Sequence, residues 1–84
     1  MLSLHYFASI RERLDKDSEE IELPASVSTV EDLIAHLRRS DPALDALFTA
    51  NNKILVAVNQ TVVSRDHQLA AGDEVAFFPP MTGG

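Results

Sequence analysis

The sequence predicts an α+β fold in which a mixed β-sheet packs against one main helix. Three observations support this prediction. Apolar and polar residues alternate over 1–7 and 18–23, as in half-buried strands, and a helical repeat of apolar residues covers 30–37. Short apolar segments then follow between 54 and 78 without a second long helical repeat. A chain of 84 residues suffices for one such domain.

Residues 1–7 are expected to form a strand, because neighbouring side chains in a strand point to opposite sides and the polarity alternates accordingly. The residues of one face are Leu2, Leu4 and Tyr6, and those of the other are Ser3, His5 and Phe7. In 8–14 the apolar residues Ile10 and Leu14 lie four apart, which predicts a short helical turn. Residues 18–23 alternate again with acidic side chains on one face, which predicts an edge strand.

The main helix is expected to begin at a capping box over 28–31, in which the Ser28 hydroxyl accepts a backbone N–H and the Glu31 carboxylate reaches back. The apolar residues that follow are three and four apart and form one buried stripe, made of Val30, Leu33, Ile34 and Leu37. Asp41-Pro42 ends this helix and can cap a further turn or two. The apolar residues of that continuation are Leu44, Leu47 and Phe48.

The last third of the chain is expected to supply the remaining strands. Residues 54–58 are apolar on both faces and predict an interior strand. The Asn-Gln pair at 59–60 predicts a tight turn into a short return strand at 61–63. Gly72 is expected where a turn requires positive φ, and 74–78 predict the final strand.

This order of elements is best accommodated by the β-grasp, in which the first and last strands lie parallel in the middle of the sheet. A ferredoxin-like fold would need a second long helix between the later strands, and 49–84 offer none. Alternation then places Phe7 and Phe78 on the exposed face of neighbouring central strands. Two exposed aromatic side chains near each other predict a docking surface.

The end of the sequence predicts an extended tail, 79–84, attached to a folded domain, 1–78. Pro79 and Pro80 lack backbone donors and fix φ, so they end the last strand and start the tail extended. Six extended residues reach roughly 20 Å, enough to enter a deep slot on another protein. Gly83 and Gly84 carry no side chains, so the terminal carboxylate is expected to be sterically bare.

Composition excludes several classes of function. The formal charge of −6, without a basic stripe, argues against nucleic-acid binding. The absence of cysteine and the separation of His5, His36 and His67 argue against a metal site, and no glycine-rich loop could hold a nucleotide. No apolar segment is long enough to span a membrane and the first residues are not those of a signal peptide, so a cytoplasmic protein is expected. We therefore expect no intrinsic cofactor or active site, and any activation of the terminal carboxylate requires a partner that uses ATP.

Three segments of the sequence together form a recognisable pattern. They are Val-Asn-Gln-Thr at 58–61, Asp66 and Leu69 followed by Gly-Asp-Glu-Val at 72–75, and above all Phe-Phe-Pro-Pro-Met-Thr-Gly-Gly at 77–84. With this pattern the sequence resembles the small subunits of molybdopterin synthase, which are ubiquitin-like sulfur carriers. The resemblance covers the whole chain and is sharpest over 56–84.

The resemblance implies that Gly84 is adenylated by a ubiquitin-activating-type adenylyltransferase and is converted to a thiocarboxylate with sulfur from a donor protein. It further implies that the tail inserts into the large subunit of the synthase, in a heterotetramer with two copies of each subunit. There the sulfur would be transferred to cyclic pyranopterin monophosphate during molybdenum cofactor biosynthesis. The residues expected to contact the large subunit are Phe7, Val62, Phe78, Pro79, Pro80, Met81 and Thr82, with Gly83 and Gly84 at the reacting end.

Three alternatives stay open at this point. The same chemistry could serve thiamin or another thio-metabolite, or Gly84 could form an isopeptide bond as in a ubiquitin-like modifier. The chain could also be a binding module with an inert tail. The apolar residues at 78–81 suit burial in a permanent partner better than conjugation to many targets.

Overall fold

The computed structural model describes residues 1–50 and 53–80, and the eight elements within them follow the predicted order. Residues 51–52 and 81–84 lie outside the described part of the chain. The strands are β1 (Leu2–Tyr6), β2 (Ser18–Ile21), β3 (Leu55–Val58), β4 (Thr61–Val63) and β5 (Glu74–Phe78). The helices are α1 (Ala8–Leu14), α2 (Val30–Ser40) and α3 (Pro42–Ala50).

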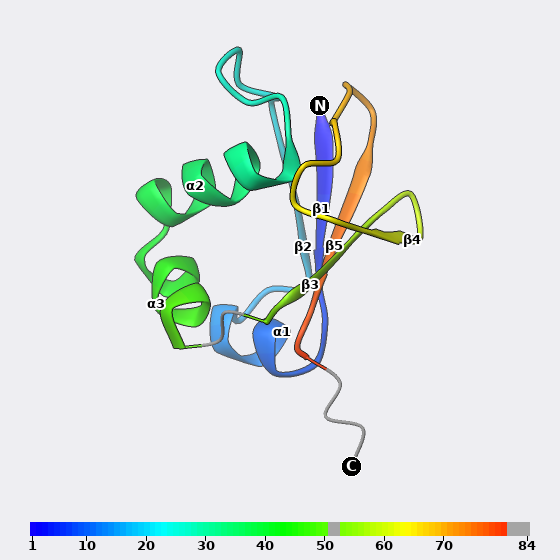
Figure 1. The fold of residues 1–84 in the computed structure, drawn as a ribbon. Coiled ribbons are helices and arrows are strands. Elements are labelled where there is room, and N and C mark those ends of the chain that lie inside the picture. Colours follow the sequence, from blue (N-terminus) through cyan, green and yellow to red (C-terminus); the bar gives the residue numbers. More distant parts are fainter. Residues whose placement is uncertain (51–52, 81–84) are drawn as a thin grey trace.

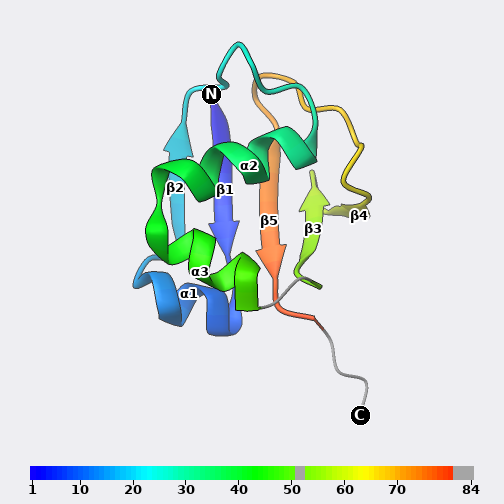
Figure 2. The ribbon, with the colours of Figure 1, turned by 60° about the vertical axis from the view of Figure 1, so that its left-hand side comes forward.

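The five strands form one mixed sheet in the order β2-β1-β5-β3-β4, with β1 and β5 parallel at its centre. The other neighbours pair antiparallel, and β2 and β4 are the edges. All three helices lie on one face of this sheet, while the other face carries no helix (Figures 1 and 2). The predicted β-grasp is confirmed, with α1 and α3 packed beside the main helix α2.

The hydrophobic core lies between the helices and the inner face of the sheet. Leu4 pairs with Val75 and Tyr6 with Phe77 across the parallel strands, and all four side chains are buried. The Tyr6 and Phe77 rings stack with centroids 5.8 Å apart. The predicted stripe of α2 and the apolar residues of α3 are buried against them, and the α3 residues are Leu44, Leu47 and Phe48. None of the helices in the described residues is long and apolar enough to cross a membrane.

The capping box of α2 is shifted by one residue from the predicted position. Thr29, not Ser28, is the N-cap, and its hydroxyl accepts the backbone N–H of Asp32 while the Asp32 carboxylate accepts that of Thr29. Asp32 also accepts hydrogen bonds from the backbone and hydroxyl of Ser28, and together these bonds hold its pKa below the usual value. Glu31 takes no part in the capping box, because the aspartate at the third helical position reaches back to the cap.

Two further N–H groups at the start of α2 are satisfied by the loop that follows β4. The N–H of Val30 donates to the carbonyl of His67 at 3.0 Å, and that of Glu31 donates to the carbonyl of Arg65 at 2.8 Å. The first N–H groups of a helix have no partner within the helix, so this loop supplies the missing acceptors. The loop thereby joins the N-terminus of α2 to the β3–β4 hairpin.

The two predicted turns are confirmed by their backbone angles. Asn59 and Gln60 have φ of 51° and 72°, the positive values that a two-residue hairpin turn between β3 and β4 requires. The Asn59 amide also donates to the Asp73 carboxylate at 3.0 Å, which joins this turn to the one before β5. Gly72 has φ of 92°, a conformation that other residues rarely adopt.

Tyr6 places the polar end of a core side chain against a carboxylate. Its hydroxyl donates to Glu19 Oε2 at 2.6 Å, and Lys16 Nζ lies 2.9 Å from the same oxygen and 3.6 Å from Asp41. Burial, and secondarily the hydrogen bond to Glu19, raises the pKa of Tyr6 far above its ordinary value of 10. Lys16 makes its own hydrogen bond to Glu19, and this bond raises the pKa of Lys16.

This raised pKa predicts an unusual alkaline titration, which is simple to follow because Tyr6 is the only tyrosine and the chain has no tryptophan. A group whose pKa is higher in the folded state stabilises it fully below the unfolded pKa, near 10, and loses that contribution as pH rises further. Tyrosinate absorbance should therefore appear only together with the loss of far-ultraviolet circular dichroism. A reversible absorbance change near pH 10 in a protein that stays folded would contradict the burial of this hydroxyl.

Candidate functional site

The face of the sheet that no helix covers, here called the outer face, is the candidate site. Strand alternation assigns to it the side chains whose neighbours along the chain point into the core. The residues of the outer face are Ser3, His5, Ser18, Glu20, Leu55, Ala57, Val62, Glu74, Ala76 and Phe78. Phe7, which follows β1 directly, adjoins them.

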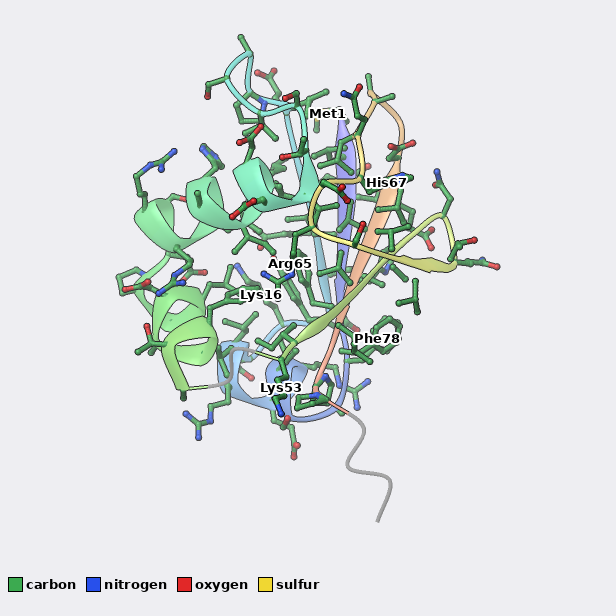
Figure 3. All side chains as sticks on the ribbon, viewed as in Figure 1. Met1, Lys16, Lys53, Arg65, His67 and Phe78 are labelled. Carbon is green, nitrogen blue, oxygen red and sulfur yellow. The ribbon has the colours of Figure 1, made fainter. Side chains whose placement is uncertain are left out.

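The two predicted aromatic residues lie together on the outer face. The rings of Phe7 and Phe78 stack with their centroids 4.7 Å apart and their planes within 5° of parallel. Phe7 is 39% exposed, and Phe78 points away from the helices (Figure 3). The Phe7 N–H donates to the Phe77 carbonyl at 3.2 Å, so the parallel pairing of β1 and β5 holds both rings in place. The predicted proximity of these rings is confirmed; Phe7 is exposed, and Phe78 is partly buried.

The predicted interior strand at 54–58 is confirmed, because β3 lies between β5 and β4. Ile54, Val56 and Val58 are buried, and so is Ala57 on the outer face. Leu55, also on the outer face, is 37% exposed and pairs with Phe78 across β3 and β5. Leu55 was not among the predicted site residues, although its place in an apolar strand beside Phe78 could have indicated it.

Val62 extends the same surface onto the edge strand. Val62 is 63% exposed. It pairs with Ala57, which lies two residues along β3 from Leu55, the partner of Phe78. Four apolar side chains thus lie side by side, one directly after β1 and the others on β5, β3 and β4. We call them the apolar strip: Phe7, Phe78, Leu55 and Val62. An exposed strip of large apolar residues is typical of a protein interface.

The apolar strip lies where the chain leaves the sheet. Pro79 and Pro80 follow Phe78 directly and are partly buried. The remaining predicted tail residues are Met81, Thr82, Gly83 and Gly84, and they lie outside the described residues. A protein that binds the apolar strip would therefore also lie beside the first residues of the tail.

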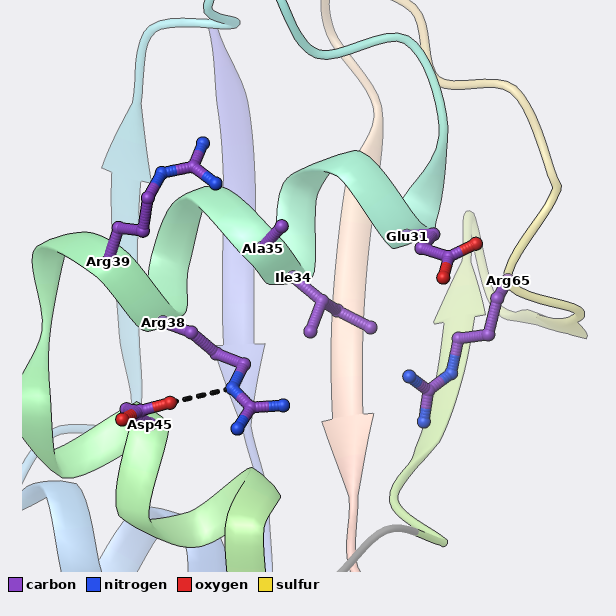
Figure 4. Close-up of a pocket in the computed structure, with 7 residues that line it drawn as sticks. All are labelled: Glu31, Ile34, Ala35, Arg38, Arg39, Asp45 and Arg65. Carbon is purple, nitrogen blue, oxygen red and sulfur yellow. Dashed lines mark hydrogen bonds and ion pairs between the residues drawn. The ribbon is translucent and has the colours of Figure 1, made fainter.

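A hollow on the helical side of the molecule is lined by the arginines Arg38, Arg39 and Arg65 (Figure 4). Arg38 bridges α2 and α3, because its Nε donates to Asp45 at 2.7 Å and its Nη2 donates to Thr49 at 3.0 Å. Arg65 donates to the Ile54 carbonyl at 3.1 Å. Two of the three guanidinium groups therefore hold elements of this fold together.

Side chains of the types used in catalysis make contacts around Ser64 and His5, but these contacts do not converge on one site. Ser64 donates a hydrogen bond to Asp66, but the backbone carbonyl of the adjacent His67 serves the start of α2. His5 Nε2 lies 3.7 Å from Glu74, on another strand. Within 1–50 and 53–80, no three His, Asp or Glu residues gather closely enough to hold a metal ion. What the described residues do offer is a surface for docking beside the tail.

Comparison with known proteins shows the family of this chain. Residues 4–84 match the ThiS family. The chain is 46% identical to the molybdopterin synthase sulfur carrier subunit of Escherichia coli (strain K12) and 39% identical to that of Haemophilus influenzae, in each case over 100% of both chains. The small archaeal modifier protein 1 of Haloferax volcanii has a similar structure, with a TM-score of 0.77 and 26% identity over 95% of this chain and 97% of that chain.

The stacked pair predicts a measurable coupling in stability. Phe7→Ala, Phe78→Ala and the double variant should show a coupling energy of about 0.5–1.5 kcal/mol in urea unfolding, because each ring loses its stacking partner when the other is removed. Val62→Ala serves as the control, since a lone exposed side chain should change stability by less than about 0.5 kcal/mol. Strictly additive effects of the two phenylalanine changes would show that the rings do not stack in solution.

Proposed function

The chain belongs to the ThiS family and to the molybdopterin synthase sulfur carrier subunits, and from this premise we propose that it carries sulfur on Gly84 for a molybdopterin synthase. The observation that carries the proposal is the 46% identity to such a subunit over the full length of both chains. The apolar strip beside the tail supports it, because a carrier must dock on its partner while the tail reaches into the partner's active site.

The chemistry begins at the carboxylate of Gly84. A ubiquitin-activating-type adenylyltransferase uses ATP to convert it to an acyl-adenylate, with release of pyrophosphate. Sulfur from a donor protein then displaces AMP and leaves a thiocarboxylate. The ATP belongs to the activating partner. Glycine suits positions 83 and 84 because any Cβ would crowd a narrow slot and hinder attack on the acyl carbon.

Transfer takes place on a second partner, the large subunit of the synthase. The tail enters that subunit's active site, and the thiocarboxylate sulfur forms a bond to cyclic pyranopterin monophosphate. Water then cleaves the bond between this sulfur and the acyl carbon and returns Gly84 to a carboxylate. Two carriers flank a dimer of the large subunit. Phe7, Val62 and Phe78 contact the large subunit, and 79–82 line the way to its active site. The carrier contributes the reacting atom and the docking surface, and the partner contributes the active site.

A ubiquitin-like modifier is the second candidate, and the structural similarity to the small archaeal modifier protein 1 favours it. In that case Gly84 would form an isopeptide bond with a lysine of a target protein. Mass spectrometry of denatured cell extracts distinguishes the two functions. A modifier leaves lysine residues linked to Gly84, whereas a sulfur carrier is recovered as a free chain.

The terminal glycine should be indispensable for sulfur transfer but not for folding. Deletion of Gly84 or Gly84→Ala should abolish formation of molybdopterin in an assay with the large subunit, the activating partner, ATP and a sulfur source. The melting temperature should stay unchanged, because neither change touches the core. Glu31→Gln, at an exposed position in the first turn of α2, is the control and should keep the activity. Normal transfer by either Gly84 variant would remove the tail from the mechanism.

The docking role of Phe78 predicts a loss of affinity. Phe78→Asp should weaken the complex with the large subunit by about 2 kcal/mol or more, because a central aromatic anchor is replaced by a charge that must be desolvated. Phe78→Leu should weaken it far less, since it keeps an apolar side chain. Isothermal titration calorimetry measures both, with the melting temperature of each variant as the folding control. Unchanged affinity of Phe78→Asp would show that another face docks.

A further inference from the structure

The chain contains few amines, and this matters because activation makes Gly84 reactive toward amines. An acyl-adenylate is a mixed anhydride, and an unprotonated amine attacks its acyl carbon as a sulfur nucleophile does. Lysine occurs at two positions, Lys16 and Lys53, and the sequence begins with the backbone amine of Met1. The structure distinguishes these three amines by their partners and by their place relative to the tail.

Lys16 is held in its charged form by two carboxylates. Its Nζ lies 2.9 Å from Glu19 Oε2 and 3.6 Å from Asp41 Oδ2. The hydrogen bond to Glu19 raises the pKa of Lys16, which favours the protonated amine. A protonated amine has no lone pair with which to attack a carbonyl carbon. Lys16 is therefore a poor nucleophile although its side chain is partly exposed.

The amine of Met1 lies at the end of the sheet away from the tail. Strands β1 and β5 are parallel, so the beginning of β1 lies beside the beginning of β5, whereas the tail follows the end of β5. The Gly72 N–H donates to the Met1 carbonyl at 2.8 Å, which holds Met1 beside the turn that precedes β5. Figure 3 shows Met1 at the opposite end of the sheet from Lys53.

Lys53 lies beside the first residues of the tail. Strands β3 and β5 are antiparallel with Leu55 opposite Phe78, and this register, continued by two residues, brings Lys53 level with Pro80. The Lys53 side chain is exposed and forms no ion pair or hydrogen bond with any other described residue. Of the three amines, Lys53 alone combines freedom from carboxylate partners among the described residues with a place at the tail end of the sheet.

We propose that Lys53 is a self-acylation site, which accepts Gly84 of the same chain when no sulfur is supplied. The inference rests on the proposed function, because only an activated Gly84 can react. The Lys53 amine attacks the acyl carbon, the bond from that carbon to the AMP oxygen breaks, and AMP leaves with the bonding electrons. The nitrogen releases a proton to water, and an amide joins Lys53 to Gly84. No oxidant or reductant is needed, because ATP has already supplied the activation.

The tail is long enough for this reaction. The four residues after Pro80 span roughly 13 Å when extended, and neighbouring strands lie only about 5 Å apart. Lysine adds a flexible four-carbon side chain, so one turn of the chain suffices to bring the two groups together. A short connection also gives the acyl group an effective concentration of about a millimolar or more at Lys53, which favours reaction within one chain.

Closure of the chain would remove the carrier from the sulfur cycle. The product has no terminal carboxylate, so it cannot be activated again, and its tail has no free end to enter a partner. A thiocarboxylate is a weak acylating agent, because its negative charge opposes attack by a nucleophile, so a carrier that has received sulfur is protected. Lys53 thereby makes the fate of the activated carrier depend on the supply of sulfur.

The experiment incubates the whole carrier with the activating adenylyltransferase and ATP, without a sulfur source, and records intact masses and pyrophosphate release. The closed chain should be lighter than the free chain by one water, and fragmentation should place the new amide between Lys53 and Gly84. Lys53→Arg keeps the charge but not the nucleophilic amine and should lower the yield of closed chain at least about tenfold. Lys16→Arg is the matched control and should change that yield by less than about twofold. Addition of a sulfur source should replace the closed chain by the thiocarboxylate.

Each outcome bears on the inference. Pyrophosphate release without closed chain, or closure that persists in Lys53→Arg, would overturn it while activation of Gly84 stands. No pyrophosphate release, under conditions in which a known carrier is activated, would overturn the proposed function and the inference together. A covalent dimer linked through Lys53, without closed chain, would place the acceptor in a second copy and overturn closure within one chain. Closure undiminished by a sulfur source would overturn its dependence on sulfur supply. Melting temperatures of both variants exclude unfolding as the cause.

Discussion

The parallel pairing of β1 with β5 is the constraint on which the rest of this structure depends. It brings the beginning and the end of the chain side by side at the centre of the sheet, with Tyr6 opposite Phe77. Alternation about that pair buries Tyr6 and Phe77 under the helices and directs Phe7 and Phe78 to the other face. The same pairing therefore builds the core and places the stacked rings where the chain leaves the sheet.

The helices support this arrangement from one side only. The caps and loop contacts of α2 hold it on the inner face, and the hydrogen bond from Tyr6 to Glu19 joins the central strand to the edge strand β2. Because the helices occupy the inner face, the outer face is left to carry the apolar strip. A domain with its core on one side and an apolar strip on the other is suited to docking, and the reacting group is expected at the end of the tail.

Much of this could be predicted from the sequence, because periodicity is local and the core follows from it. The strands, the stripe of α2, the turn at 59–60 and the place of Phe7 and Phe78 on the outer face were all predictable in this way. Leu55 was missed because an apolar run conceals which face is covered, and only the absence of a helix on the outer side decides it. The cap at Thr29 was missed because two adjacent hydroxyl residues compete, and the side-chain length of Asp32 selects between them. The place of Lys53 beside Pro80 depends on strand register, which no single segment reveals.

The central claim is that Gly84 carries sulfur, and the intact mass of the chain tests it most directly. The protein would be purified from its native host and also after incubation with the activating partner, ATP and a sulfur source. The account predicts a species heavier by one exchange of oxygen for sulfur, with the change localised to Gly84 by fragmentation. If the complete activating mixture produced only the unmodified carboxylate, while a known carrier gained sulfur under the same conditions, the account would be contradicted.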